Sequence, residues 1–183
     1  KEISAFVADS SPDAFAKVVE RLLASPRYGE RWGRHWLDVA RYTDQEIRTE
    51  KEYSAAWRYR DWVIDAFDQD LRYDQFVKAQ IAADLISEEK DPRLLPALGF
   101  ISLGTWIYQA DIPYAVARAD ELDDRLDVLT RGFLGLTVAC ARCHDHKYDP
   151  ISQKDYYALA GIFANTDYHQ YFLASDEIVA KHE

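Results

Sequence analysis

Methionine is absent from the 183 residues of this chain, and cysteine occurs only twice, at Cys140 and Cys143. The first absence removes the thioether from every metal site the chain can build. The second excludes a framework of several disulfides. A single bridge across so short a loop would restrict the unfolded chain little, so chemistry explains the cysteine pair better than stability does.

Basic residues are also scarce, with 22 Lys and Arg against 32 Asp and Glu and a formal net charge of −10. No basic patch is large enough to neutralise a row of phosphates, which argues against nucleic acid as a partner. A partner protein with a positive face, or a neighbouring domain of the same polypeptide, fits this charge better. No apolar run is long enough to span a bilayer. No signal peptide is visible and the chain starts at Lys1, so we expect a fragment of a larger exported multidomain protein.

Apolar and aromatic residues are plentiful, at 48% and 14% of the chain. This composition and length predict one folded domain over residues 1–183, with a core at about 11–165 and a partly mobile tail at 166–183. The aromatic side chains are explained by core packing, although they would also suit a pocket for a flat ligand.

Hydrophobic periodicity predicts a mainly α fold, a single helical domain of about six to seven helices. A capping sequence at Ser152 to Asp155 should open the last helix. The helices are expected from Ser11 to Pro26, over 28–42, 55–67, 73–86, 94–108 and 119–141, and from Ser152 through Phe163. A polar loop is expected at 43–53, and the cysteine pair should lie at the C-terminal end of the longest helix.

Residues 140–144 read Cys-Ala-Arg-Cys-His, the C-x-x-C-H pattern of haem attachment. Two thiols at this spacing can reach two vinyl groups on one porphyrin edge. His144, the next residue, can then supply an imidazole nitrogen to the iron. We therefore predict one haem c, covalently held by Cys140 and Cys143, with His144 as proximal ligand.

Three other interpretations of the pair stay open. A redox-active dithiol of the thioredoxin type normally accompanies βαβ elements, which this pattern does not show. A zinc site would need Cys140, Cys143, His144 and His146, although zinc usually takes two separated pairs of ligands. The third interpretation is coincidence, with two buried cysteines beside a surface histidine.

The second axial ligand cannot be methionine. His146 follows the proximal ligand too closely to reach the opposite face, so a propionate contact or a hydrogen bond that fixes the loop suits it better. His169 and His182 lie in the tail. This leaves His35 as the candidate distal ligand, because it falls on the apolar side of a helix beside Trp32 and Trp36; the alternative is a partly buried, hydrogen-bonded core histidine.

Further residues are candidates for the haem surroundings. Possible haem-pocket residues are Trp32, Trp36, Arg142 and His146. An arginine fork also suits a haem propionate, and the available ones are Arg34, Arg41, Arg58, Arg60 and Arg142. Ordinary pairing with nearby aspartates is the favoured alternative for each arginine.

Three long stretches carry a resemblance to a known family: RWGRHWLDVARY at 31–42, WRYRDWVI at 57–64, and LGLTVACARCHDHKYDPI at 134–151, which runs on to Asp155-Tyr156-Tyr157. The chain resembles the second type of planctomycete-type cytochrome c domain, long catalogued as a domain of unknown function. The resemblance implies an exported, haem-bearing module of a large bacterial protein, periplasmic or otherwise extracytoplasmic. It supplies a cofactor but no substrate.

A single covalent haem is compatible with three roles. The leading hypothesis is a c-type cytochrome domain that transfers single electrons, rather than a catalyst on its own. The alternative is catalysis or small-ligand binding at an open sixth coordination site, as in a peroxidase or a gas sensor. The third is an interaction module whose haem is structural.

Overall fold

The computed structural model describes residues 1–43, 55–86, 91–104 and 112–166. Over these ranges the chain forms eight α-helices and three 3-10 turns, with no strand, which confirms a helical domain and adds to the expected number of helices. The elements are α1 (Glu2–Ala8), α2 (Ala14–Leu23), α3 (Arg27–Val39), α4 (Ala56–Asp68), α5 (Tyr73–Ala82), η1 (Ala83–Leu85), η2 (Leu95–Leu98), α6 (Gly99–Ser102), α7 (Tyr114–Leu134), η3 (Val138–Arg142) and α8 (Gln153–Ala164).

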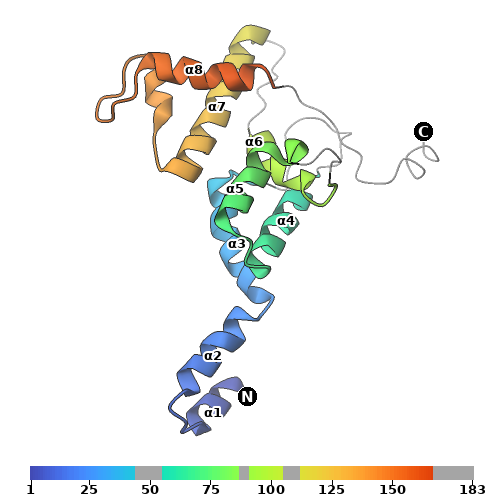
Figure 1. Cartoon of the computed structure of the whole chain (residues 1–183). Coiled ribbons are helices and arrows are strands. Elements are labelled where there is room, and N and C mark those ends of the chain that lie inside the picture. The colour runs from blue at the N-terminus through green and yellow to red at the C-terminus, as the bar shows by residue number, and fades with distance from the viewer. Residues whose placement is uncertain (44–54, 87–90, 105–111, 167–183) are drawn as a thin grey trace, which may run out of the picture.

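Two hydrophobic clusters form the core, and α7 contributes to both. The first cluster joins α3, α4, α5, η2 and α6 around Tyr59, Val63 and Phe100. The second joins α7, η3 and α8 around Leu126 and Tyr156. Figure 1 shows α8 lying across α7, with α3 to α6 grouped below them. The cysteine motif therefore belongs to a small subdomain built on α7 and α8.

Helix α3 packs against α4 at Gly29 and Gly33, while Trp36 and Leu37 pack into the first cluster. Gly29 and Gly33 are the buried residues of α3, and the Gly29 N–H donates to the Asp68 carboxylate at 2.8 Å. The stripe expected to face the core includes Trp32, which is 50% exposed. The prediction was wrong on this point, because a hydrophobicity pattern gives no weight to glycine, whose lack of a side chain permits the closest helix approach.

Replacing Gly29 by alanine is expected to destabilise the fold by about 1–3 kcal/mol through overpacking. An added Cβ would lie 2.5 Å from the backbone oxygen of Ile64, which cannot rotate away. Gly161→Ala is the matched control, since its Cβ would meet nothing within 4 Å, and it should add up to about 1 kcal/mol through helix propensity. Urea unfolding of both variants measures the difference, and equal effects would contradict the proposed helix contact.

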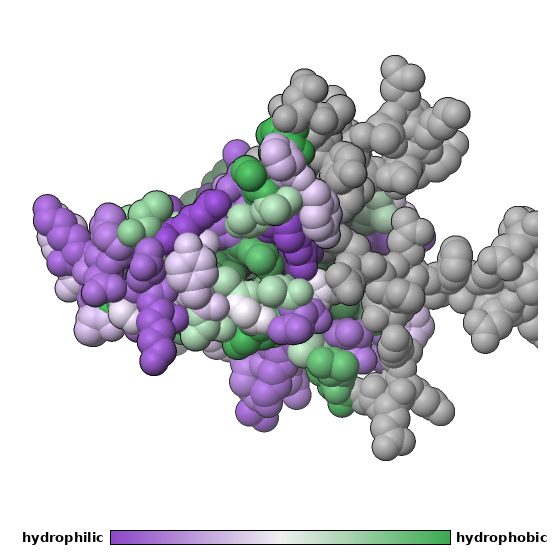
Figure 2. All heavy atoms as spheres, turned by 90° about the horizontal axis from the view of Figure 1, so that it is seen from above, coloured by the Kyte–Doolittle hydropathy of each residue, from purple (hydrophilic) through white to green (hydrophobic). Residues whose placement is uncertain are grey.

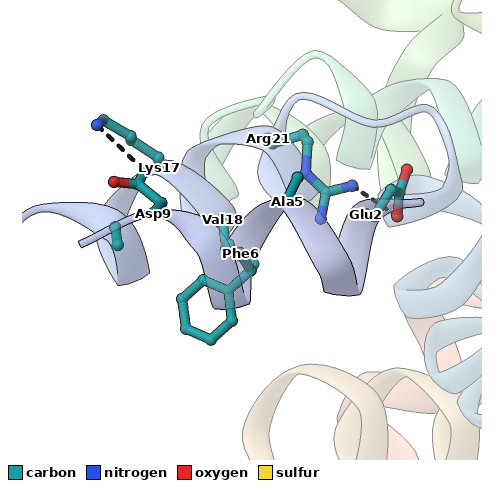
Figure 3. A pocket seen from close by; sticks show the side chains of 8 residues that line it. Glu2, Ala5, Phe6, Asp9, Lys17, Val18 and Arg21 are labelled. Carbon is teal, nitrogen blue, oxygen red and sulfur yellow. Dashed lines mark hydrogen bonds and ion pairs between the residues drawn. The ribbon is translucent and has the colours of Figure 1, made fainter. Parts of the chain in front are cut away.

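Helices α1 and α2 form a hairpin that stands away from the two clusters (Figure 1). Within residues 1–43, neither helix has a buried residue, and Phe15 of α2 is 71% exposed. Ion pairs from Arg21 to Glu2 at 2.9 Å and from Lys17 to Asp9 at 3.3 Å join the two helices. Figure 3 shows these pairs flanking a shallow hollow that Phe6 lines. The hairpin is held by surface contacts and adds little to the core.

The expected helix boundaries near the motif need one correction. Helix α7 ends at Leu134, because Gly135 adopts a left-handed φ of 67° that closes the helix. Cys140 consequently lies on the separate turn η3 and Cys143 at its C-cap, not at the end of the longest helix. The capping box is confirmed, with Ser152 accepting from the Asp155 N–H and Asp155 accepting from the Ser152 N–H.

Three predicted segments lie outside the described residues: the polar loop at 44–53, part of the expected helix at 105–108, and the tail at 167–183.

The surface is mixed in character. Figure 2 shows hydrophilic residues crowded at one end of the molecule and apolar residues gathered nearer its middle. Among the described residues, no helix is both long and apolar enough to cross a membrane.

Candidate functional site

The turn η3 presents the two cysteines on one exposed face. In a 3-10 helix, residues three apart lie above one another. Val138 and Ala141 follow this spacing and are buried in the second cluster. Cys140 on η3 and Cys143 at its C-cap are also three residues apart, and both cysteines are free and exposed. The local sequence therefore anchors the turn by its small apolar residues and directs both thiols outward.

His144 is oriented by the carbonyl that follows it. Its Nδ1 lies 2.7 Å from the backbone oxygen of Asp145, and the ring is exposed. A carbonyl oxygen only accepts, so Nδ1 carries the proton and Nε2 keeps its lone pair. A metal-ligating histidine is held in the same way, with one nitrogen donating to a backbone carbonyl and the other on the metal. His144 thus has the tautomer that an axial ligand needs.

His146 has the opposite character, because its side chain is 5% exposed and its ring is used within the loop. Nδ1 accepts from the backbone N–H groups of Asp149 at 2.9 Å and Tyr148 at 3.3 Å. Nε2 therefore carries the proton and lies 3.4 Å from the Thr137 hydroxyl. The Asp149 carboxylate is also 3.3 Å from Nδ1, but a nitrogen that accepts two N–H groups does not form an ion pair. The loop-fixing role expected for His146 is present, and neither ring nitrogen is open to a metal.

Two residues of α8, Gln153 and Tyr157, form hydrogen bonds to the motif. The Gln153 side-chain amide donates to the Arg142 backbone oxygen at 3.1 Å, and the Tyr157 hydroxyl donates to the same oxygen at 3.2 Å. The Gln153 N–H donates to the Asp145 carboxylate at 2.8 Å. The sequence analysis did not identify Gln153 or Tyr157 as residues that contact the motif. The signal that could have found them is the capping box, which fixes where the first turn of α8 meets the motif.

The Arg142 side chain points at α7. Its guanidinium donates to Asp120 at 2.8 Å and lies 3.5 Å from Asp123, which also accepts from the Tyr156 hydroxyl at 2.5 Å. The hydrogen bond to Asp120 raises the pKa of Arg142, and burial together with the bond to Asp123 raises the pKa of Tyr156. Arg142 is the ordinary ion-pair partner that the alternative interpretation expected, and it fastens η3 to α7.

The candidates from α3 lie in the other part of the core. Trp36 packs in the first cluster, where its indole N–H lies 2.7 Å from the Gln80 amide oxygen and 3.1 Å from the Tyr59 hydroxyl. His35 is exposed, and in the described structure its ring neighbours come from its own helix: Arg31 Nη1 at 2.8 Å from Nε2, and the Trp32 ring at 5.5 Å. The structure thus joins Cys140, Cys143, His144, Arg142 and His146, and shows no contact from His35, Trp32 or Trp36 to that group.

The side chains at η3 fit a covalent haem better than a zinc ion. Two exposed thiols on one face and one imidazole with a free Nε2 are the donor set of c-type attachment. A zinc site at the motif would also need His146, whose nitrogens are engaged in the loop. In the parts of the chain that the structure describes, no group of three or more His, Cys, Asp or Glu side chains converges as a metal site would require.

Comparison with known proteins gives one match. The family model described as "PSCyt2: Protein of unknown function (DUF1549)" matches residues 1–168. No curated protein and no solved structure matches the chain.

Proposed function

Because the chain belongs to the PSCyt2 family, as its resemblance predicted, we propose that it is a c-type cytochrome domain that transfers single electrons. Cys140 and Cys143 would hold one haem c through thioether bonds, and His144 would be its proximal ligand. When bound, the haem would supply an iron that gains and loses one electron. We also propose an extracytoplasmic location for the domain.

The orientation of His144 carries this proposal. The hydrogen bond from Nδ1 to the Asp145 oxygen fixes which nitrogen is free. His146 does not compete with His144 as an iron ligand, because its Nδ1 accepts hydrogen bonds from the Tyr148 and Asp149 N–H groups. A preorganised ligand of this kind binds without losing further side-chain freedom.

The proposed partner is a redox protein with a basic face or a neighbouring domain of the same polypeptide. The net charge of −10 would favour encounter with a positively charged surface. The exposed thiols belong to a turn whose other face is buried against α7 and α8. A haem attached there would keep one edge near solvent, as exchange of electrons with a partner requires.

A pyridine haemochrome spectrum after acid–acetone extraction tests the proposal. The protein should be expressed with export and with haem-attachment machinery. We expect the haem to stay with the protein and the α band to have the position of a thioether-linked haem. Protein that carries no haem under these conditions would refute the proposal.

A second candidate function is small-ligand binding or catalysis at an open sixth position. Three observations favour it: the chain has no methionine, His146 has both ring nitrogens engaged, and Nε2 of His35 accepts from Arg31. For His35 to act as distal ligand it would have to leave Arg31. A high-spin ferrous spectrum that shifts on addition of carbon monoxide would support the open site, and a low-spin spectrum unaffected by carbon monoxide would support closed electron transfer.

A further inference from the structure

Arg41 adopts an unusual backbone conformation just after α3. Its φ is 58°, in the left-handed region that glycine normally occupies. The Arg41 N–H donates to the Asp38 oxygen at 3.3 Å and the Tyr42 N–H donates to the Leu37 oxygen at 3.0 Å. This pair of bonds is the Schellman motif, where glycine is preferred because any side chain costs about 1–2 kcal/mol. The motif explains the turn but not why an arginine occupies it.

The guanidinium of Arg41 is only partly used. Its Nη2 donates to the Asp124 carboxylate on α7 at 2.7 Å. Among the residues that the structure describes, no hydrogen-bond partner lies at Nε or Nη1, and both nitrogens are buried. These two nitrogens carry three N–H groups, and buried donors in native proteins almost always have acceptors. The open donors indicate an acceptor that the described part of the chain does not provide.

Gly104 shapes the space beside this guanidinium. A Cβ at Gly104 would collide with the Asp124 carboxylate and lie 2.7 Å from Nη2 of Arg41. The acids next to Asp124 on α7 are matched by other arginines, Asp127 by Arg131 at 2.7 Å and Asp123 by Arg142 at 3.5 Å. The absence of a side chain at Gly104 therefore lets the Asp124 carboxylate and the Arg41 guanidinium lie against the backbone that follows α6.

We propose that the unused donors of Arg41 bind a carboxylate group that is not part of this chain. A carboxylate brings a negative charge and several lone pairs, and guanidinium donors match both. Its source is either a propionate of the attached haem or a free organic acid. The haem source rests on the proposed function, whereas the free-acid source does not.

Arg41 is distinguished from the other arginines considered for this role. Arg58 stacks over the Trp57 ring at 4.6 Å, and Arg60 pairs with Asp61 at 2.8 Å. Arg142 is held by α7, and Arg34 lies exposed on α3. Arg41 combines a buried guanidinium nitrogen pair with a backbone conformation that another residue would adopt more easily. Both features are explained if the side chain is kept for a ligand.

The test uses the double variant Arg41→Gly/Asp124→Asn. Glycine suits the left-handed φ, and asparagine avoids leaving a buried charge, so the fold should survive; circular dichroism checks this. Arg93→Ala, which removes an exposed arginine paired with Asp91, is the control. The first readout is the pH dependence of the haem reduction potential. Compared with Asp124→Asn alone, the double variant should move the propionate inflection upward by about one pH unit or more, because the neighbouring cation lowers a carboxyl pKa.

The second readout needs no haem. The melting temperature of protein in which Cys140 and Cys143 are serine is measured in sodium acetate and in sodium chloride of equal ionic strength. Acetate at several times its Kd should raise it by about 2–4 °C only when Arg41 is present. An Arg41-dependent pH inflection identifies the propionate source, and an acetate response without it identifies the free acid. If haem never attaches, the proposed function fails while the acetate measurement still decides the site. If neither readout depends on Arg41, the inference is overturned.

Discussion

Changing Cys140 and Cys143 together to serine is expected to abolish all haem that survives acid–acetone extraction. Serine is close in size to cysteine but forms no thioether, and both thiols are exposed, so the fold should be retained. Each single variant should keep one thioether and a reduced amount of haem, with a shifted α band in the pyridine haemochrome spectrum. The mass of the intact protein measures the covalent adduct directly.

Lys154→Ala is the control for these cysteine variants, because Lys154 is an exposed residue of α8 near the motif. It should carry as much haem as the unchanged protein. Covalent haem in the double serine variant would refute attachment at η3. Loss of helical content in the same variant would assign the cysteines a structural role instead.

The motif itself could be predicted from sequence because its chemistry depends on neighbouring residues. Five consecutive positions contain both thiols and the imidazole, and the capping box at Ser152 and Asp155 is equally local. The family resemblance rests on the same continuous stretches and is confirmed by the match over residues 1–168. Local patterns of this kind need no knowledge of the tertiary fold.

Most of the errors concern features that depend on distant contacts. One error is local, because Gly135 is a helix C-cap with a left-handed φ and ends the longest helix before the cysteine turn. Glycine has no hydrophobic signal, so the packing of Gly29 and Gly33 on α4 was also missed. A helix pattern identifies an apolar face but does not identify which neighbour covers it. His35 was thus expected on a buried side and is exposed.

The hydrogen bonds that individual side chains form could also not be predicted from the sequence. Spacing showed that His146 lies near His144, but not that its ring would be 5% exposed and fully used by the loop. Arg41 was one of five candidate arginines, and only its buried nitrogens in the folded chain separate it from the rest. Such distinctions arise from three-dimensional burial, which sets whether a polar group has water as a partner.

The two histidines of the motif should respond oppositely to alanine substitution. His144→Ala should change haem-free stability by no more than about 0.5 kcal/mol, because the exposed ring bonds only to the adjacent carbonyl. His146→Ala should cost about 1–3 kcal/mol, because the Tyr148 and Asp149 N–H groups lose their acceptor. Urea unfolding of protein with both cysteines changed to serine measures these differences without haem.

In haem-loaded protein the order of the two effects should reverse. His144→Ala would remove the proposed proximal imidazole, so the Soret band and the electron paramagnetic resonance spectrum should change to those of an altered axial ligand. His146→Ala should leave the spectra of the attached haem unchanged, because its ring lies in the loop hydrogen bonds and not on the iron. Spectra altered by His146→Ala and unaltered by His144→Ala would exchange the two assignments. A general loss of structure would change both the stability and the spectra. Loss of a ligand should change only the spectra, and loss of a loop-fixing residue should change only the stability, so the crossed pattern separates these cases.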